Sequence, residues 1–304
     1  MPAPDAYPRD LVGYAGSPPD PRWPGGARVA LNFVINHEEG GERSILHGDA
    51  TAESRLTDLA PAPPLVGMRD LTMESAYEYG ARVGIWRVLK LFAERGIPFT
   101  TYAVGMAMER NPRVVEALAA TGCDWVDHGY RWFDYAKVDE ATERAHMEQG
   151  LAVFRRMTGA TPPGWYIGTP SLCTRAMRVA AGGFIYDSDD YSDDLPHWVQ
   201  VDGRAHLVVP HTLDLNDTRL ARGLGWGQAR DFTETLIDAF DARHAEGGAM
   251  MTVALHPRLI GKPERMMHFA RFLDHVMRHD RVWIARRIEI ARHWIATHPP
   301  GTKA

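Results

Sequence analysis

The sequence has few cysteines, no long apolar run and no excess of basic residues. Two cysteines, Cys123 and Cys173, in 304 residues are too few for a disulfide framework, and no CxxC motif indicates a structural zinc site. No stretch approaches the roughly 18 apolar residues that a membrane-spanning helix needs. A formal net charge of −5 provides no basic surface for nucleic acid. We therefore expect a cytoplasmic protein with neither a membrane nor a nucleic-acid partner.

The ends and loops of the chain also lack familiar signals. The N-terminus has no basic segment followed by an apolar one, so no signal peptide is expected. No GxGxxG motif follows the first apolar run, so no dinucleotide cofactor is expected. Residues 1–26 are rich in Pro and Gly and are predicted to form an extended arm on the body of the protein or on a neighbouring subunit. The rest, 27–300, is predicted to be one domain.

Apolar runs alternate with helical patterns along this domain. Strands are predicted at 28–34, 98–104, 123–127, 164–167, 184–187, 206–209, 250–255 and 282–285. Helices are predicted at 81–95, 112–121, 140–157, 174–181, 230–245, 264–279 and 288–297. Parallel strands need crossover helices, so about seven such repeats predict a closed or nearly closed α/β barrel rather than two Rossmann halves.

A long insertion at 41–80 shows no periodicity. Loops of this length in compact domains are usually lids or subunit contacts. It follows the first strand, so we expect it over the face where barrel active sites form. The arm and this insertion together favour a homo-oligomer.

Polar residues follow three of the predicted strands. They are the pair Glu38 and Glu39, then His128, then His256. The carboxyl ends of parallel strands meet at one face of a barrel, and a carboxylate with a raised pKa beside two histidines could perform acid–base hydrolysis. A Glu pair in a loop is more often solvated, and a lone His is more often structural. The apolar run before His256 and the glycines after Glu39 favour the functional interpretation.

Two further groups are open to either interpretation. The acidic stretch 187–194 could bind a cation, but we expect most of its carboxylates to orient basic residues or to face water, and keep Asp189 as a supporting candidate. Tryptophans at 132, 165, 198 and 226 could wall a small pocket or pack in the core.

Many short stretches resemble one known family. They are 7–14, 38–43, 46–49, 73–75, 77–80, 128–132, 164–166, 186–189, 193–196, 258–261 and 291–294. On these the chain resembles the polysaccharide deacetylase (NodB-homology) superfamily, and more closely its allantoinase branch, which is described as metal-independent. The resemblance implies an irregular (β/α)7–8 barrel, a tetramer and a small-molecule substrate.

The resemblance also implies roles for the strand-end residues. Deacetylases of this superfamily carry two aspartates where Glu38 and Glu39 stand, the first a base and the second a metal ligand. Their two metal-binding histidines are spaced HxxxH, which places the first at His128 and the second at Trp132. Three protein ligands are usual for catalytic zinc, so the loss of one implies no cofactor, or at most a weakly bound divalent metal on Glu39 and His128. His256 matches the late histidine that acts as general acid.

The chain departs from the allantoinase pattern after 164–166. Thr169 stands where that branch has an arginine, and Cys173 where it has an asparagine. Losing a forked donor makes the expected pocket more apolar and leaves the identity of the substrate open. The residues we expect to contact substrate are Glu39, Trp132, Trp165, Tyr166 and Thr169.

Three functions remain open on this basis. The first is a C–N hydrolase that opens a small cyclic amide such as allantoin, a hydantoin or an imide. Glu38 would activate water, His128 would stabilise the oxyanion, and His256 would protonate the leaving nitrogen. The second is a metal-dependent deacetylase of an N-acetyl sugar. The third is a non-catalytic binding protein, which the joint presence of Glu38, His128 and His256 disfavours.

Overall fold

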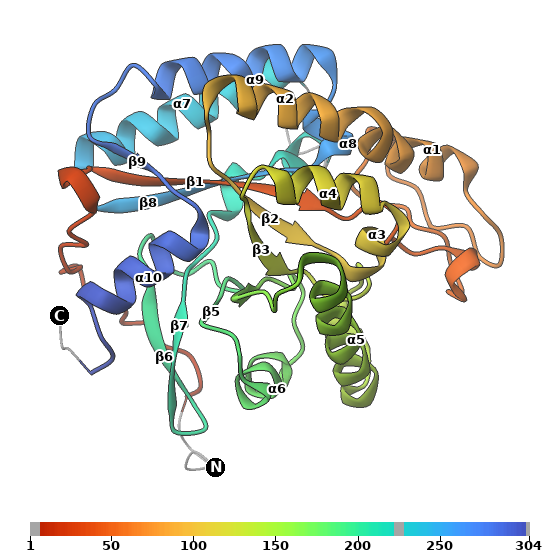
Figure 1. Cartoon of the computed structure of the whole chain (residues 1–304), viewed down its shortest axis with the longest axis horizontal. Helices are drawn as coiled ribbons and strands as arrows, with labels where there is room; N and C mark the ends of the chain where they lie inside the picture. Colours follow the sequence, from red (N-terminus) through yellow and green to blue (C-terminus); the bar gives the residue numbers. More distant parts are fainter. Residues whose placement is uncertain (1–6, 222–227, 302–304) are drawn as a thin grey trace.

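The computed structural model describes residues 7–221 and 228–301, which fold into one curled sheet surrounded by helices (Figure 1). The strands are β1 Val29–His37, β2 Thr100–Ala103, β3 Asp124–Asp127, β4 Gly164–Trp165, β5 Tyr186–Asp187, β6 His197–Val201, β7 Arg204–Val208, β8 Ala249–Leu255 and β9 Val282–Ile284. The helices are α1 Leu71–Tyr79, α2 Ile85–Arg95, α3 Gly105–Arg110, α4 Pro112–Ala120, α5 Glu140–Thr158, α6 Thr174–Ala181, α7 Ala229–Glu246, α8 Pro257–Ile260, α9 Pro263–Val276 and α10 Arg287–Thr297.

The sheet has the order β6-β7-β5-β4-β3-β2-β1-β8, with β9 added beside β1. Every pair is parallel except β6 with β7. Strand β1 is the longest and is buried along its whole length, because β8 pairs with it on one side and β2 and β9 on the other. This arrangement confirms the predicted α/β barrel of the NodB type, and in the described residues the sheet is curled without closing between β6 and β8.

Local sequence signals account for the helix ends that were predicted. Helix α2 ends where Gly96 adopts a left-handed conformation with φ of +61°, which a residue without a Cβ reaches at little cost. Helix α5 begins after Asp139, whose side chain accepts a hydrogen bond from the Thr142 amide. Five predicted helices, 112–121, 140–157, 174–181, 230–245 and 288–297, lie within one or two residues of the observed ones.

A β-hairpin stands where no second strand was predicted. Strands β6 and β7 are joined by Asp202 and Gly203, whose φ angles are +48° and +76°. Positive φ at both central residues is the signature of the tight hairpin turns for which Asp-Gly is a strong sequence signal. The prediction missed β6 because its residues His197 to Val201 do not alternate clearly between apolar and polar.

The insertion at 41–80 is partly ordered rather than structureless. Helix α1 occupies its end and begins after Asp70, whose carboxylate accepts hydrogen bonds from the amides of Thr72 and Met73. Tyr77 of this helix is buried and contacts the residues described below as the candidate site. A short π-helical turn, Gly80–Gly84, then joins α1 to α2. The insertion therefore covers the carboxyl ends of the strands, as expected from its position after the first strand.

The two largest apolar cores lie on the two faces of the sheet. The outer core packs odd-numbered residues of β1, such as Phe33, against α2, α7 and α9, which lie along one side of β1 and β8 in Figure 1. The inner core packs even-numbered residues, such as Val34, against α10. Trp23 of the N-terminal arm also packs in this inner core, and its indole donates to the Ala249 carbonyl at 3.1 Å. No helix in the described part of the chain is long and apolar enough to cross a membrane.

Candidate active site

Three strand ends bring Glu38, His128 and His256 into contact. Glu38 follows β1, His128 follows β3 and His256 follows β8, all at the carboxyl edge of the sheet. Glu38 Oε1 lies 3.1 Å from His128 Nε2 and 3.3 Å from His256 Nε2. All three side chains are at most 5% exposed. Residues that are 90 and 218 positions from Glu38 in the sequence therefore form one buried acid–base cluster.

The ring of His128 is held from behind by Tyr166. Its Nδ1 donates a hydrogen bond to the Tyr166 carbonyl oxygen over 2.5 Å. The two rings also stack, with centroids 5.4 Å apart. Nε2 is thereby directed at Glu38, which is the orientation that a site built around this carboxylate needs.

His256 is held by a carboxylate that sequence reasoning missed. Asp217 Oδ1 lies 2.6 Å from His256 Nδ1, and Asp217 Oδ2 accepts the His256 backbone N–H at 2.7 Å. Burial alone would lower the pKa of His256, but the charges of Glu38 and Asp217 raise it to about 9. His256 is therefore an imidazolium at neutral pH. Asp217 begins a single 3-10 turn, Asp217–Leu220, and no periodic pattern distinguished it from its neighbours Asp214 and Asn216.

Arg258 is a second component that sequence reasoning did not assign to the site. Its Nη2 forms an ion pair with Glu38 Oε2 at 2.8 Å, and its Nη1 donates to Glu39 Oε1 at 3.3 Å. Its Nε donates to the Leu56 carbonyl in the insertion. The guanidinium carbon lies 4.5 Å from the ring centroid of Tyr77. Sequence alone offered a signal, since this arginine follows His256 by two residues.

Trp132 completes the surroundings of this guanidinium. Its ring centroid lies 5.4 Å from the Arg258 guanidinium carbon and 6.2 Å from the Tyr77 ring. The two aromatic rings and the two carboxylates thus enclose a fully buried cation. Trp132 covers the arginine that neutralises the carboxylate pair, and its expected contact with substrate stays a prediction.

The two adjacent carboxylates have opposite pKa shifts. Burial would raise the pKa of Glu38, but the charges of His256 and Arg258 and the hydrogen bonds from both histidines hold it well below its usual value. Burial raises the pKa of Glu39, which has only Arg258 as a strong countercharge and lies beside the charge of Glu38. The raised pKa expected of a catalytic carboxylate is therefore wrong for Glu38, because the two histidines and Arg258, which that expectation did not include, favour its ionised form.

The other residues expected to bind substrate lie in different surroundings. Tyr166 is buried beside His128, and its hydroxyl lies 2.9 Å from that of Tyr191. Trp165, the preceding residue on the strand, faces the other way and stacks on His206 with centroids 4.9 Å apart. Thr169 is exposed, and its hydroxyl donates to the Phe133 carbonyl.

The remaining candidates from the sequence are structural in their contacts. Trp198 donates from its indole to the His298 carbonyl, and Trp226 lies outside the described residues. In the acidic stretch, Asp187 pairs with Arg175 and His206. Asp189 accepts hydrogen bonds from the amides of Ile167 and Gly168, and burial together with the charge of Asp187 raises its pKa to about 6. This carboxylate shapes the loop that follows Tyr166.

His211 is a further buried residue that sequence reasoning missed. Its ring stacks on Tyr166 with centroids 4.9 Å apart, and His128 stacks on the same tyrosine. Burial lowers its pKa, and the charges of Arg287, His256 and His128 lower it further, so the imidazole is neutral. It also lines a cavity of about 300 Å³ with Tyr191 and Arg243.

The chain is similar to known polysaccharide deacetylases and to an allantoinase. A family model described as polysaccharide deacetylase matches residues 69–181. A Schizosaccharomyces pombe protein named "Putative polysaccharide deacetylase" is 39% identical, covering 96% of this chain and 98% of its own. The crystal structure of "Puue Allantoinase" has 50% identity and a TM-score of 0.95, with 97% of this chain and 99% of that chain covered. A structure named "probable Polysaccharide deacetylase" from Pseudomonas aeruginosa PAO1 has 49% identity and a TM-score of 0.94, covering 96% and 99%.

Proposed function

The chain belongs to the polysaccharide deacetylase (NodB) family, and from this premise we propose that it hydrolyses a ring C–N bond in a small cyclic amide such as allantoin. The similarity to the allantoinase structure extends over nearly the whole of both chains and supports this choice within the family. A hydantoin or a cyclic imide has the same reacting group and stays a candidate because Thr169 and Cys173 change the predicted pocket.

The observation that carries the proposal is the position of Arg258 between the two carboxylates. The metal-dependent members implied by the resemblance would use Glu39, His128 and a histidine at position 132 as ligands. Here Glu39 binds Arg258, and position 132 holds an indole that covers the same guanidinium. A divalent ion beside Glu39 would face a fixed positive charge and have fewer than the three protein ligands usual for catalytic zinc. These residues do not fit a metal, and we propose chemistry that needs none.

The burial of the cluster supports a small substrate. Glu38, His128 and His256 are at most 5% exposed, and Tyr77 and Trp132 cover Arg258 from the insertion side. A polysaccharide needs an open groove along which several sugar rings can lie, whereas a ring of a few atoms can be enclosed. Enclosure also strengthens every electrostatic contact with the substrate, because it excludes water.

The charges assign a role to each group in the proposed reaction. Glu38, which is ionised, accepts a proton from the water that attacks the ring carbonyl. His128, whose Nε2 is directed at Glu38, would stabilise the oxygen that becomes negative. His256, protonated at neutral pH, gives its proton to the departing ring nitrogen, and the C–N bond breaks to leave a carboxylate and an opened ureido or amide chain. Because its pKa is low, Glu38 is a weak base until substrate and water loosen its contact with His256.

A substrate panel tests the proposal directly. Purified protein would be assayed with allantoin, hydantoin, succinimide, dihydropyrimidine and N-acetylglucosamine oligomers, each with and without chelator. We expect turnover of a cyclic amide that is unaffected by chelation. Turnover confined to N-acetyl sugars and abolished by chelator would favour metal-dependent deacetylation instead, and no turnover on any compound would favour a non-catalytic role.

Two matched substitutions test the role of the carboxylates. Glu38→Gln removes the proposed base and is expected to lower kcat by a factor of about 10²–10⁴. Glu39→Gln makes the same change in charge and size one residue away and is expected to retain more activity. If Glu38→Gln turned over normally while Glu39→Gln did not, the assignment of the base to Glu38 would be wrong.

A further inference from the structure

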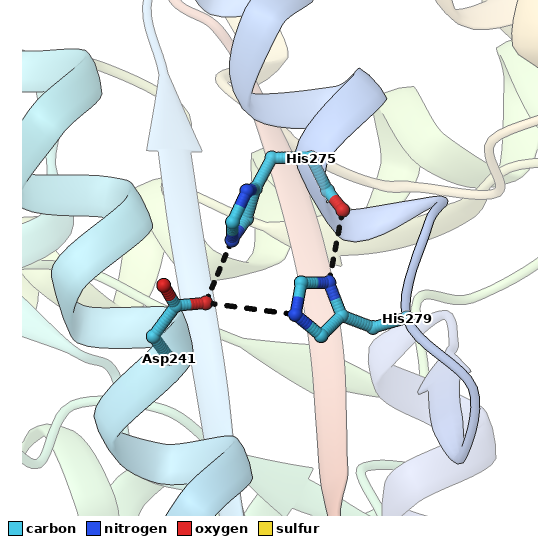
Figure 2. A group of neighbouring side chains, drawn as sticks. All are labelled: Asp241, His275 and His279. Atoms are coloured by element: carbon cyan, nitrogen blue, oxygen red, sulfur yellow. Dashed lines mark hydrogen bonds and ion pairs between the residues drawn. The ribbon is translucent and has the colours of Figure 1, made fainter.

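A second histidine cluster lies on the outer helices, away from the candidate active site. Asp241 comes from α7, His275 from the last turn of α9, and His279 from the turn just after it (Figure 2). In the part of the chain that the structure describes, they form a group of three potential ligands whose donor atoms all lie within 4.8 Å of one another. Neither the proposed reaction nor the fold requires this convergence.

The geometry of the three side chains suits a divalent metal ion. Asp241 Oδ1 lies 2.7 Å from His275 Nε2 and 3.9 Å from His279 Nε2. Ligands about 2.0–2.1 Å from a tetrahedral ion are about 3.3 Å apart, between these two distances. Helix α9 ends at Val276, and the turn that follows returns His279 to the side of His275, where both Nε2 atoms face Asp241 Oδ1. Small side-chain rotations would therefore complete three-ligand coordination.

One histidine already has the tautomer that a metal needs. His279 Nδ1 lies 3.0 Å from the His275 carbonyl oxygen, so Nδ1 carries the proton and donates to it (Figure 2). In the neutral ring this leaves the lone pair of His279 Nε2 directed at Asp241. A ring nitrogen fixed in this way by a backbone carbonyl is the usual support for a metal-binding histidine. His275 Nε2 currently faces the same carboxylate oxygen and would exchange its proton for the ion.

The surroundings hold the rings in place and leave a path for the ion. The buried ring of Phe240 contacts both imidazoles edge-on, with centroids 5.9 Å from His275 and 5.1 Å from His279. The three ligand side chains are 27–47% exposed. The cluster lies near the carboxyl ends of α7 and α9, where the helix dipoles favour positive charge. His244 is near but its Nε2 bonds the Asp280 carbonyl, which leaves the fourth position to water.

The cluster lies at the opposite end of the sheet from Glu38. Helix α9 starts close to the carboxyl end of β8 and finishes just before the amino end of β9. Its last turn therefore lies at the amino ends of the parallel strands, whereas the candidate active site lies at their carboxyl ends. A metal here would have a structural role, and its loss should leave the acid–base cluster intact.

We propose that Asp241, His275 and His279 bind one divalent transition-metal ion of the zinc class, which ties α7 to α9 at the amino end of the sheet. Two imidazoles and one carboxylate are ligands that zinc, nickel and copper accept, whereas calcium and magnesium prefer oxygen alone. Metal found in the purified protein would therefore be expected at this structural site, so metal content alone would not show that catalysis uses a metal.

Zinc titration of the full chain tests this site. Equilibrium dialysis with zinc chloride alone should give one ion per wild-type chain. The double variant His275→Gln/His279→Gln, and separately Asp241→Asn, should bind at least ten-fold more weakly. His268→Gln, which changes another histidine on α9, is the matched control and should bind as wild type does. Zinc should raise the Tm of wild type and of the control but not of the double variant.

Two further measurements keep the outcome unambiguous. Circular dichroism of the variants checks that weaker binding does not come from unfolding. Asp241→Asn changes an exposed side chain and should leave α7 and α9 folded. Cobalt bound in place of zinc should show the visible bands of a four-coordinate site in wild type and in the His268→Gln control but not in the double variant. Equal zinc affinity in wild type and the double variant, or no stoichiometric zinc in wild type, would overturn the proposal. Turnover of the preferred cyclic amide should be the same in all these proteins, whatever that substrate is.

Discussion

Asp217→Asn changes the one carboxylate that holds His256 from behind. The two oxygens of Asp217 accept hydrogen bonds from the side chain and the backbone of His256, at 2.6 and 2.7 Å. Asparagine has nearly the same shape but only one oxygen, so one of the two His256 donors would face an amide N–H group. The variant therefore removes a charge and one acceptor while leaving the volume unchanged.

The expected change follows from the pKa of His256. The charges of Glu38 and Asp217 raise this pKa from 6.5 to about 9 against the effect of burial. A hydrogen bond to a charged group contributes about 1.5–3 kcal/mol. At 1.36 kcal/mol per unit, its loss lowers the pKa by roughly 1–2 units. A general acid works only while protonated, so the alkaline limb of kcat/KM should move from about pH 9 to about pH 7–8.

The assay is a pH profile of kcat/KM for the preferred cyclic amide between pH 5 and roughly 10. Asp214→Asn, an exposed substitution three residues earlier, is the matched control and should keep the alkaline limb of wild type. An unmoved limb in folded Asp217→Asn would refute the role of His256 as the acid or of Asp217 as its support.

Protein stability provides a second measure of the same contact. The pKa of His256 is higher in the folded protein than in the unfolded chain, so its contribution is complete below about pH 6.5 and is lost as pH rises through about 9. A shift of about 2.5 units corresponds to about 3 kcal/mol of unfolding free energy. Urea denaturation between pH 6 and 9.5 should show a smaller loss of stability in Asp217→Asn than in wild type.

Three other substitutions have defined outcomes. Gly80→Ala would place a methyl group 2.5 Å from Glu39 Oε1 and 2.8 Å from the Arg258 backbone nitrogen, so both activity and Tm should fall, as steady-state assay and thermal melting would measure. Arg258→Met leaves a buried carboxylate pair without its countercharge, so urea denaturation should show a loss of about 3–5 kcal/mol and the acid limb of kcat/KM should move to higher pH. Arg258→Lys, measured in the same two ways, should recover part of each effect. Arg287→Leu removes a buried guanidinium that donates hydrogen bonds to Ser188, Thr252 and the Val209 carbonyl. The free energy of unfolding measured in urea should fall by about 3 kcal/mol.

The alternation of strands and helices could be predicted because each element carries its own local pattern. The run before His256 is apolar on both faces, which is the pattern of a buried parallel strand, and it is observed as β8. Where the local pattern was weak, prediction failed: β6 has mixed composition, and α1 lies within a stretch without periodicity. Asp202-Gly203 and Asp70 were usable signals for these two elements.

The three strand-end residues were also predictable, because the position of a residue at the end of a parallel strand decides which face it reaches. Their mutual contacts agree with this reasoning, whereas their roles in catalysis stay predictions. Strand-end position alone did not decide which neighbouring ring reaches the site. Side chains alternate along a strand, so Tyr166 stacks on His128 whereas Trp165, one residue earlier, stacks on His206.

By itself, the sequence determined the fold class and the convergence of Glu38, His128 and His256, because strand pattern and strand-end position are local properties. Only the tertiary structure decided the charge state of that cluster. Asp217 and Arg258 come from two short helical segments, the 3-10 turn Asp217–Leu220 and α8, and they act through contacts of about 3 Å or less that no spacing encodes. A pKa depends on burial and on every nearby charge, so it belongs to the folded assembly of groups and not to any one of them.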